Sequence, residues 1–143
     1  MATITYASRP DGWFWELVTD DGLSYDTLKF YSSKEECLTS AETFRASANT
    51  FPSASIVELD RHKQKDTPLA FNYVIEVLPP QSMYHYQWRW YWVMEDGTEV
   101  FTLESNPAST EASAREACRK RIEAFVALSS QIAAAEIVEG ATT

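Results

Sequence analysis

Few residues of this chain could do acid–base or nucleophilic chemistry, and they lie far apart. The sequence has two histidines, His62 and His85. Neither has the spaced partners of a metal site, such as a second histidine one helical turn away or a Cys-x-x-Cys pair. Glycine-rich phosphate loops and the usual hydrolase motifs are also missing from the sequence. We therefore expect no catalytic residue, no metal and no cofactor, and an activity that is not enzymatic.

The two cysteines are better explained by packing than by reactivity. Cys37 precedes Ala41, and Cys118 precedes Ile122, each by one turn on an apolar stripe of a predicted helix. A buried free cysteine behaves as a small hydrophobic residue. Two cysteines 81 positions apart do not make a disulfide framework, so we expect a reducing compartment, the cytoplasm.

An aromatic run at residues 84–92 is the most unusual stretch of the sequence. Three tryptophans at alternate positions are expected to face the core beneath the helices: Trp88, Trp90 and Trp92. The run begins earlier than the equivalent stretch in the first half of the chain, and tyrosine and arginine are enriched at interface hot spots. Four side chains are therefore candidates for an exposed interaction surface: Tyr84, Tyr86, Arg89 and Tyr91.

Single-stranded RNA is the alternative partner, since exposed aromatic rings beside Arg89 could stack on bases. The net charge of −9, from 21 acidic and 12 basic residues, argues against nucleic acid and against an anionic membrane. A second candidate patch is basic: Arg115, Arg119, Lys120 and Arg121. Because Glu111 and Glu116 each precede one of these bases by one turn, we expect a solvated, self-neutralising helix face there, with contact to an anionic partner as the alternative.

Recurring segments indicate an internal duplication. The stretch at residues 13–22, alternating in aromatic and apolar residues and ending in acid-Asp-Gly, recurs 75 positions later at residues 88–97. Farther along, the offset is 81, where Cys37 corresponds to Cys118 and the Ile-Val-Glu at 56–58 to that at 137–139. The change of offset places the extra residues before Cys118, so the second helix is predicted to be longer than the first.

Each copy is predicted to consist of three strands, a helix and a closing strand. In the first copy, the strands are expected at residues 3–7, 13–18, 24–31 and 55–59, with a helix capped by Ser33. The second copy is expected to place them at 73–78, where Pro79-Pro80 ends the strand, and at 84–94, 99–104 and 135–139. Its helix is expected to be capped by Ser109 or Thr110 and to run to about Ser130.

The predicted fold class is α+β: two β-β-β-α-β repeats related by a pseudo-two-fold axis, in an antiparallel sheet with both helices packed on one side. We expect residues 1–143 to form one domain, with repeats at 3–59 and 71–139, a linker at 60–70 and a frayed tail at 140–143. Neither half alone has enough residues to bury a good core.

Four features together resemble the YegP-like tandem-repeat family, small bacterial proteins of unknown function. They are the Trp-x-Trp-x-Leu strand at 13–17, the acid-Asp-Gly turn, the Ser-Ser-Lys-Glu-Glu helix start at 32–36 and the closing Ser-Ile-Val-Glu-Leu at 55–59. The resemblance covers most of residues 3–59 and 71–139. It implies the repeat fold and a bacterial origin, and it supplies no active site.

The function expected from the sequence is that of a non-enzymatic binding or interaction module. Its partner is expected to be another protein or a small ligand, not a membrane and not nucleic acid, and the chain is expected to be a monomer or a weak homodimer. No apolar run approaches the length of a bilayer span.

Overall fold

The computed structural model describes residues 1–59, 70–82, 85–102, 106–108, 110 to 141, and within these ranges it leaves out the side chains at 59, 77–82, 85–88, 106–108 and 111. The strands are β1 (Thr3–Arg9), β2 (Gly12–Val18), β3 (Ser24–Asp26), β4 (Ile56–Leu59), β5 (Tyr73–Ser82), β6 (His85–Val93), β7 (Glu99–Thr102), β8 (Asn106–Ala108) and β9 (Glu136–Glu139). The helices are α1 (Lys34–Ala46), the 3-10 helix η1 (Ser47–Ser53), α2 (Glu111–Ala127) and α3 (Ser129–Ala133).

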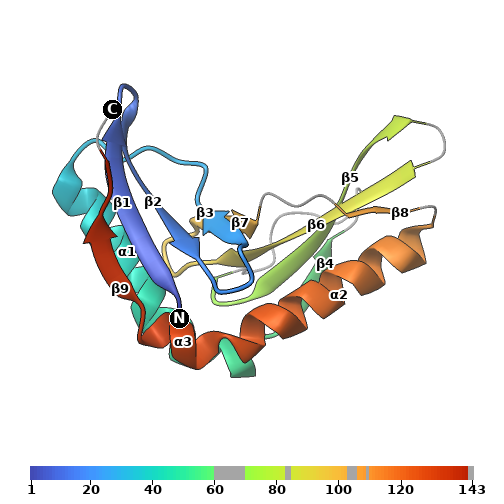
Figure 1. The fold of residues 1–143 in the computed structure, drawn as a ribbon. Helices are drawn as coiled ribbons and strands as arrows, with labels where there is room; N and C mark the ends of the chain where they lie inside the picture. Colours follow the sequence, from blue (N-terminus) through green and yellow to red (C-terminus); the bar gives the residue numbers. More distant parts are fainter. Residues whose placement is uncertain (60–69, 83–84, 103–105, 109, 142–143) are drawn as a thin grey trace.

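The described strands form one sheet in the order β4-β5-β6-β7-β3-β2-β1-β9, with β8 pairing β6 beside this path (Figure 1). Strands β1, β2 and β3 pair antiparallel, as do β5, β6 and β7, and β3 meets β7 at the centre. Strand β4 instead pairs parallel with β5, and β9 pairs parallel with β1. The fold is therefore α+β, but the prediction of an antiparallel sheet is wrong at both edges. Each closing strand follows a helix that carries the chain over to the opposite half, where it runs parallel to its neighbour.

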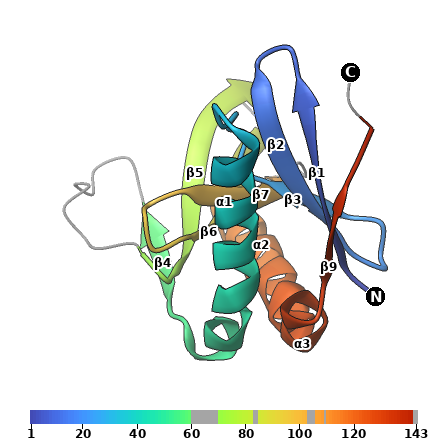
Figure 2. The same ribbon diagram turned by 90° about the vertical axis from the view of Figure 1, so that its left-hand side faces the viewer.

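Both long helices lie on the same face of the sheet, as predicted (Figure 2). One continuous core holds Cys37 and Phe44 of α1 together with Cys118 and Phe125 of α2, and all four are at most 1% exposed. Trp15 of β2 lies in that core at 0% exposure. Within the described residues, no helix is both long enough and apolar enough to cross a membrane.

The helix starts follow their predicted caps. Ser33 has extended backbone angles, and its hydroxyl accepts from the Glu36 N–H at 3.2 Å. Of the two predicted caps for α2, the structure uses Thr110, which accepts from the Ser113 N–H at 3.1 Å. With 17 residues against 13, α2 is the longer helix, as the change of offset predicted.

The strand predicted at residues 24–31 is much shorter in the structure. Strand β3 ends at Asp26, whose carboxylate accepts from the Leu28 N–H at 2.7 Å, and Leu28 has a left-handed φ of 53°. The chain rejoins the sheet only at Tyr31, which exchanges two backbone hydrogen bonds with Trp13 at 2.9 and 2.7 Å. Residues 27–30 therefore form a loop that leaves the sheet plane.

One smaller expectation also changes. Strand β5 continues past Pro79-Pro80 to Ser82, because the second half of β5 pairs with β6 only through an irregular register that tolerates missing N–H donors. In the predicted frayed tail, the Gly140 N–H donates to the Tyr6 carbonyl at 2.7 Å, and residues 142–143 lie outside the described residues. The predicted linker lies outside the described residues, except for residue 70.

Candidate functional site

The aromatic run divides between the two faces of the sheet. Trp90 and Trp92 are 2% and 0% exposed and face the helices, which confirms their predicted place in the core. Tyr91 faces the other side but is also buried, at 2% exposure, so the prediction that it lies on an exposed surface is wrong. Tyr84 lies outside the described residues, as do the side chains of Tyr86 and Trp88.

Neighbouring strands explain the burial of Tyr91. In the sheet register it lies opposite Val74 of β5 on one side and Phe101 of β7 on the other. These residues and Val93 form a second small apolar cluster, on the face away from the helices. A side chain on a central strand is covered from both sides, and sequence alternation alone does not reveal this.

Arg89 lies beside this cluster and has partners there. Its guanidinium forms an ion pair with Glu76 and lies 4.9 Å from the centre of the Phe101 ring. Glu76 also accepts a hydrogen bond from the Tyr91 hydroxyl at 3.1 Å. Burial raises the pKa of the Tyr91 phenol above its ordinary value, and the carboxylates of Glu76 and Glu99 raise it further. Arg89, Glu76 and Tyr91 therefore form a polar network, in which each side chain has a partner, beside the apolar cluster.

The basic patch on α2 is not a single surface in the structure. Arg119 binds both carboxylate oxygens of Glu58 on β4 at 2.9 Å, and Arg115 approaches the same carboxylate at 3.3 Å. The Thr19 hydroxyl lowers the pKa of Asp21 by donating to its carboxylate, and the positive charge of Arg121 lowers it further. Lys120 is exposed. Three of the four bases therefore have carboxylate neighbours within the chain.

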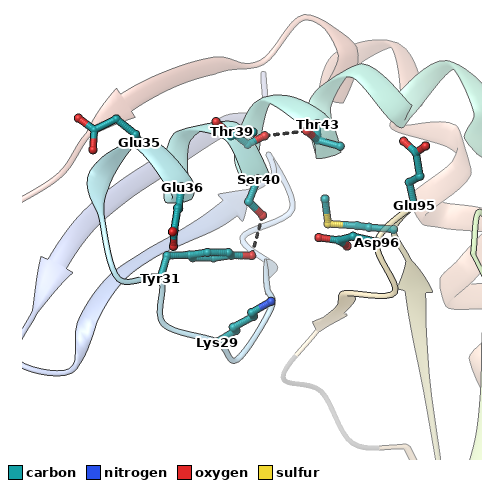
Figure 3. A pocket seen from close by; sticks show the side chains of 10 residues that line it. Lys29, Tyr31, Glu35, Glu36, Thr39, Ser40, Thr43, Glu95 and Asp96 are labelled. Atoms are coloured by element: carbon teal, nitrogen blue, oxygen red, sulfur yellow. Dashed lines mark hydrogen bonds between the residues drawn. The ribbon is translucent and has the colours of Figure 1, made fainter.

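A cleft of about 740 Å³ lies between α1, the loop at residues 27–31 and the turn that joins β6 to β7 (Figure 3). We call it the α1 cleft. Its walls are Lys29 and Tyr31 from the loop, five residues of α1, and Met94, Glu95 and Asp96 from the turn. The first half of the chain supplies two walls, and the second half supplies the third.

Hydrogen bonds fix the wall of the cleft to the core. Ser40 is 9% exposed, and its hydroxyl accepts from the buried Trp15 indole N–H at 2.9 Å. The same oxygen lies 2.6 Å from the Tyr31 hydroxyl, as the dashed line in Figure 3 marks. Met94, at 2% exposure, lines the cleft from the turn that joins β6 to β7. The Tyr31 ring is thus positioned by a core tryptophan through one serine.

The charges around the α1 cleft are mainly negative. Of the described residues that line it, four carry carboxylates and one, Lys29, carries an ammonium group; the four acids are Glu35, Glu36, Glu95 and Asp96. Figure 3 shows Glu35 at the outer rim, pointing away from the hollow, and Asp96 pointing toward Tyr31.

Asp96 is held ionised. The Thr98 N–H donates to its carboxylate at 2.9 Å and lowers the pKa of Asp96, and the Lys29 ammonium lowers it further. Lys29 also lies over the Tyr31 ring, with its nitrogen 5.2 Å from the ring centre.

This lining offers binding groups: carboxylates, hydroxyls and an aromatic ring, with neither cysteine nor histidine among them. Within the part of the chain that the structure describes, no three His, Cys, Asp or Glu side chains are grouped so as to hold a metal ion. Sequence reasoning missed this site because it assigned Glu95 and Asp96 to a turn and Lys29 to a strand. Only the fold brings them together.

Comparisons with protein-family models, with curated proteins and with solved structures gave no significant match to this chain.

Proposed function

We propose that the protein is a non-catalytic binding module and that the α1 cleft is its ligand site. One observation carries this proposal: a hollow of about 740 Å³ whose polar wall is hydrogen-bonded to the core through Ser40. Ligand pockets are typically about 300–1,000 Å³ and are largely formed before the ligand arrives. A wall fixed in this way loses little freedom when a ligand binds.

Binding explains the cleft better than catalysis does. A general acid in a cleft usually has a raised pKa, so that it carries a proton near neutral pH. The pKa of Asp96 is instead lowered, and its carboxylate acts as a fixed negative charge. Single-stranded RNA binding has less support, because Tyr91 is buried and Arg89 already has a carboxylate partner.

We also infer that the chain consists of two β-β-β-α-β repeats related by a pseudo-two-fold axis, as in the YegP-like family. The strand order supports this. If β1, β2, β3 and β4 are exchanged with β5, β6, β7 and β9, the order of strands along the path is simply reversed. The two parallel pairings, β4 with β5 and β9 with β1, also exchange with each other. The axis would pass between β3 and β7, and the two repeats would form one domain.

We place the module in the bacterial cytoplasm. The support for this proposal is that Cys37 and Cys118 are free and buried, as expected of a protein that needs no disulfide.

A cleft-filling variant tests the proposed function. The methyl group of Met94 can be observed by NMR in methionine-labelled protein during a screen of small neutral and charged compounds. We expect some compounds to shift the Met94 signal saturably and to raise the melting temperature. Thr39→Trp, which fills the cleft, should abolish both effects, whereas Glu42→Trp on an exposed position of α1 should leave them.

Two results would contradict the proposal. One is a compound that is turned over by the protein, which would make the chain an enzyme. The other concerns a screen that also includes partners captured from a bacterial lysate. If every compound and partner that binds the protein also binds the Thr39→Trp variant, the cleft is not the binding site.

A further inference from the structure

We infer that the α1 cleft takes an alkylammonium or guanidinium group, carried either by a polyamine or by a lysine or arginine side chain of a peptide. The inference rests on the proposed function, because it assumes that the cleft is a ligand site. It adds the charge and the shape of the ligand.

The charges of the cleft lining favour a cation. Glu36, Glu95 and Asp96 face or border the hollow, and among the described residues that line it Lys29 is the one base. The chain as a whole carries a net charge of −9, so its field also attracts cations and repels anions. A phosphate or carboxylate ligand would have to enter against both the local and the global charge.

The cleft already holds an alkylammonium group of its own, that of Lys29. The Lys29 nitrogen lies 5.2 Å from the centre of the Tyr31 ring, a cation–π arrangement. The same ammonium lowers the pKa of Asp96. The ring and the carboxylate therefore act together on a primary ammonium group at the end of an aliphatic chain, which is the chemistry that we assign to the ligand.

The cleft also offers apolar surface between these charged groups. Met94 lines it from the β6–β7 turn, and Tyr31 lines it from the loop at residues 27–31. Lysine and arginine side chains bury their methylene stems against such surfaces while the charged head stays at a polar rim. A ligand with an aliphatic stem fits this arrangement better than a compact inorganic cation does.

Lys29 then has a defined role as an internal competitor. Its ammonium occupies the position of the ligand's head group, and the ligand must displace it. Lys29 itself is exposed and stands on the loop next to the left-handed Leu28, so displacement breaks no core contact. Removal of its charge should therefore strengthen the binding of a cation, whereas it would weaken the binding of an anion.

The experiment follows the Met94 methyl signal by NMR in the full chain. The probes are spermidine, a capped Ala-Lys-Ala peptide and inorganic phosphate, each added to millimolar concentration, and Met1, which is not among the lining residues, serves as the internal reference. We expect saturable Met94 shifts with spermidine, the peptide or both, weaker at high salt, and none with phosphate. Binding of the peptide alone would assign the ligand to a protein partner, and binding of spermidine alone to a free polyamine.

Matched variants test the roles of the charges. Lys29→Gln should bind the cationic probe about fivefold more tightly and Asp96→Asn about fivefold more weakly, the effect of one unit charge at contact distance in water. Asparagine keeps the oxygen that accepts from Thr98, so the turn stays intact. Lys120→Gln and Glu42→Gln change the net charge by the same amounts on exposed positions outside the cleft lining, and they should alter the affinity much less.

Two outcomes would overturn the inference and leave the proposed function standing. One is that phosphate shifts the Met94 signal and that the shift is lost in Lys29→Gln, which would make the cleft an anion site. The other is that neutral compounds shift the Met94 signal while neither cationic probe shifts it. If no compound of any charge reaches Met94, the inference and the proposed function fail together.

Discussion

At the scale of single residues, Ser40 connects the core of the protein to its candidate site. Its hydroxyl is the acceptor for the Trp15 indole N–H and the partner of the Tyr31 hydroxyl. A buried donor that loses its acceptor costs about 1–3 kcal/mol. The same side chain thus contributes to the stability of the fold and to the position of the cleft wall.

We predict that Ser40→Ala lowers the free energy of unfolding by about 1–3 kcal/mol, because it leaves the Trp15 N–H without a partner. Urea denaturation measures the effect. In Trp15→Phe protein, which has no such N–H, the same serine change should cost clearly less, and this non-additivity identifies the hydrogen bond as the cause. Equal costs in both backgrounds would mean that Ser40 acts through packing or through the Tyr31 hydroxyl and not through the Trp15 hydrogen bond.

Cys37 provides a second prediction, on pH. Burial raises the pKa of its thiol to about 11, against about 8.5 for a free cysteine. The folded state thus holds the proton more tightly, and the stability from this group is fully present below pH 8.5 and is lost as the pH rises toward 11. We expect a thiol reagent at pH 8 to label Cys37 at the rate of unfolding, and added urea to accelerate labelling. Rapid labelling of the folded protein would show that α1 opens locally.

Tyr91 illustrates at this scale what a sequence does not contain. Alternation correctly assigned Trp90 and Trp92 to the core face and Tyr91 to the opposite face. Whether that second face is open depends on the neighbours across the sheet, Val74 and Phe101, which come from other parts of the chain. Periodicity predicts the face of a residue, and burial on that face depends on tertiary pairing.

At the scale of elements, the loop at residues 27–31 determines the shape of the candidate site. A strand through this stretch would have pointed Lys29 and Tyr31 along one face of the sheet. The turn at Leu28 instead carries Lys29 and Tyr31 to the edge of α1, where Asp96 approaches them. Left-handed backbone costs a leucine roughly 1–2 kcal/mol relative to glycine or asparagine. The chain keeps this strained residue where the cleft is formed.

We predict that Leu28→Asn stabilises the protein by about 1 kcal/mol, because asparagine tolerates the left-handed φ of 53° and the leucine side chain is 61% exposed. Thermal denaturation measures the gain. Leu28→Ala removes the same side chain but keeps the backbone penalty, so it should give no gain. If both variants behave alike, the effect belongs to the lost apolar surface and not to the backbone.

The element boundaries were predictable where a local signal exists. Gly22 and Gly97 have φ values of 81° and 88° in the two hairpin turns, as their Asp-Gly sequences indicate, and Ser33 caps α1. The strands that pair with β4 and β9 were not predictable. The Ile-Val-Glu pattern indicates which side chains share a face of the sheet, but it does not indicate which strand lies alongside. The α1 cleft was missed for the same reason, since Lys29 and Asp96 are 67 positions apart.

At the scale of the whole molecule, the two halves depend on each other for their edges and for their core. Strand β1 pairs with β9 and β5 with β4, so each half supplies the outermost strand of the other. Ion pairs follow the same path, since Glu58 of β4 binds Arg119 of α2. We therefore predict that residues 1–68, expressed alone, show no cooperative monomeric unfolding transition by circular dichroism. A fragment that stays monomeric and melts cooperatively would contradict the single domain that we propose.

Phe51 gives the sharpest test of this shared core. It belongs to η1 in the first half. The centre of its ring lies 4.8 Å from that of Trp92 and 4.9 Å from that of Phe125, and both of these residues belong to the second half. Phe51→Ala should cost about 3–5 kcal/mol, the usual cost of deleting a buried phenylalanine, out of a total of about 5–15 kcal/mol.

Because both halves lose contacts, both should be destabilised together in Phe51→Ala. Hydrogen exchange followed by mass spectrometry should show faster exchange in β2 and in β6 by the same factor, and the urea transition should remain single. The exposed Phe30→Ala provides the control, since it removes the same kind of ring at 47% exposure and should cost much less. Faster exchange confined to the first half would mean that the two halves unfold as separate units and that Phe51 stabilises only the first half.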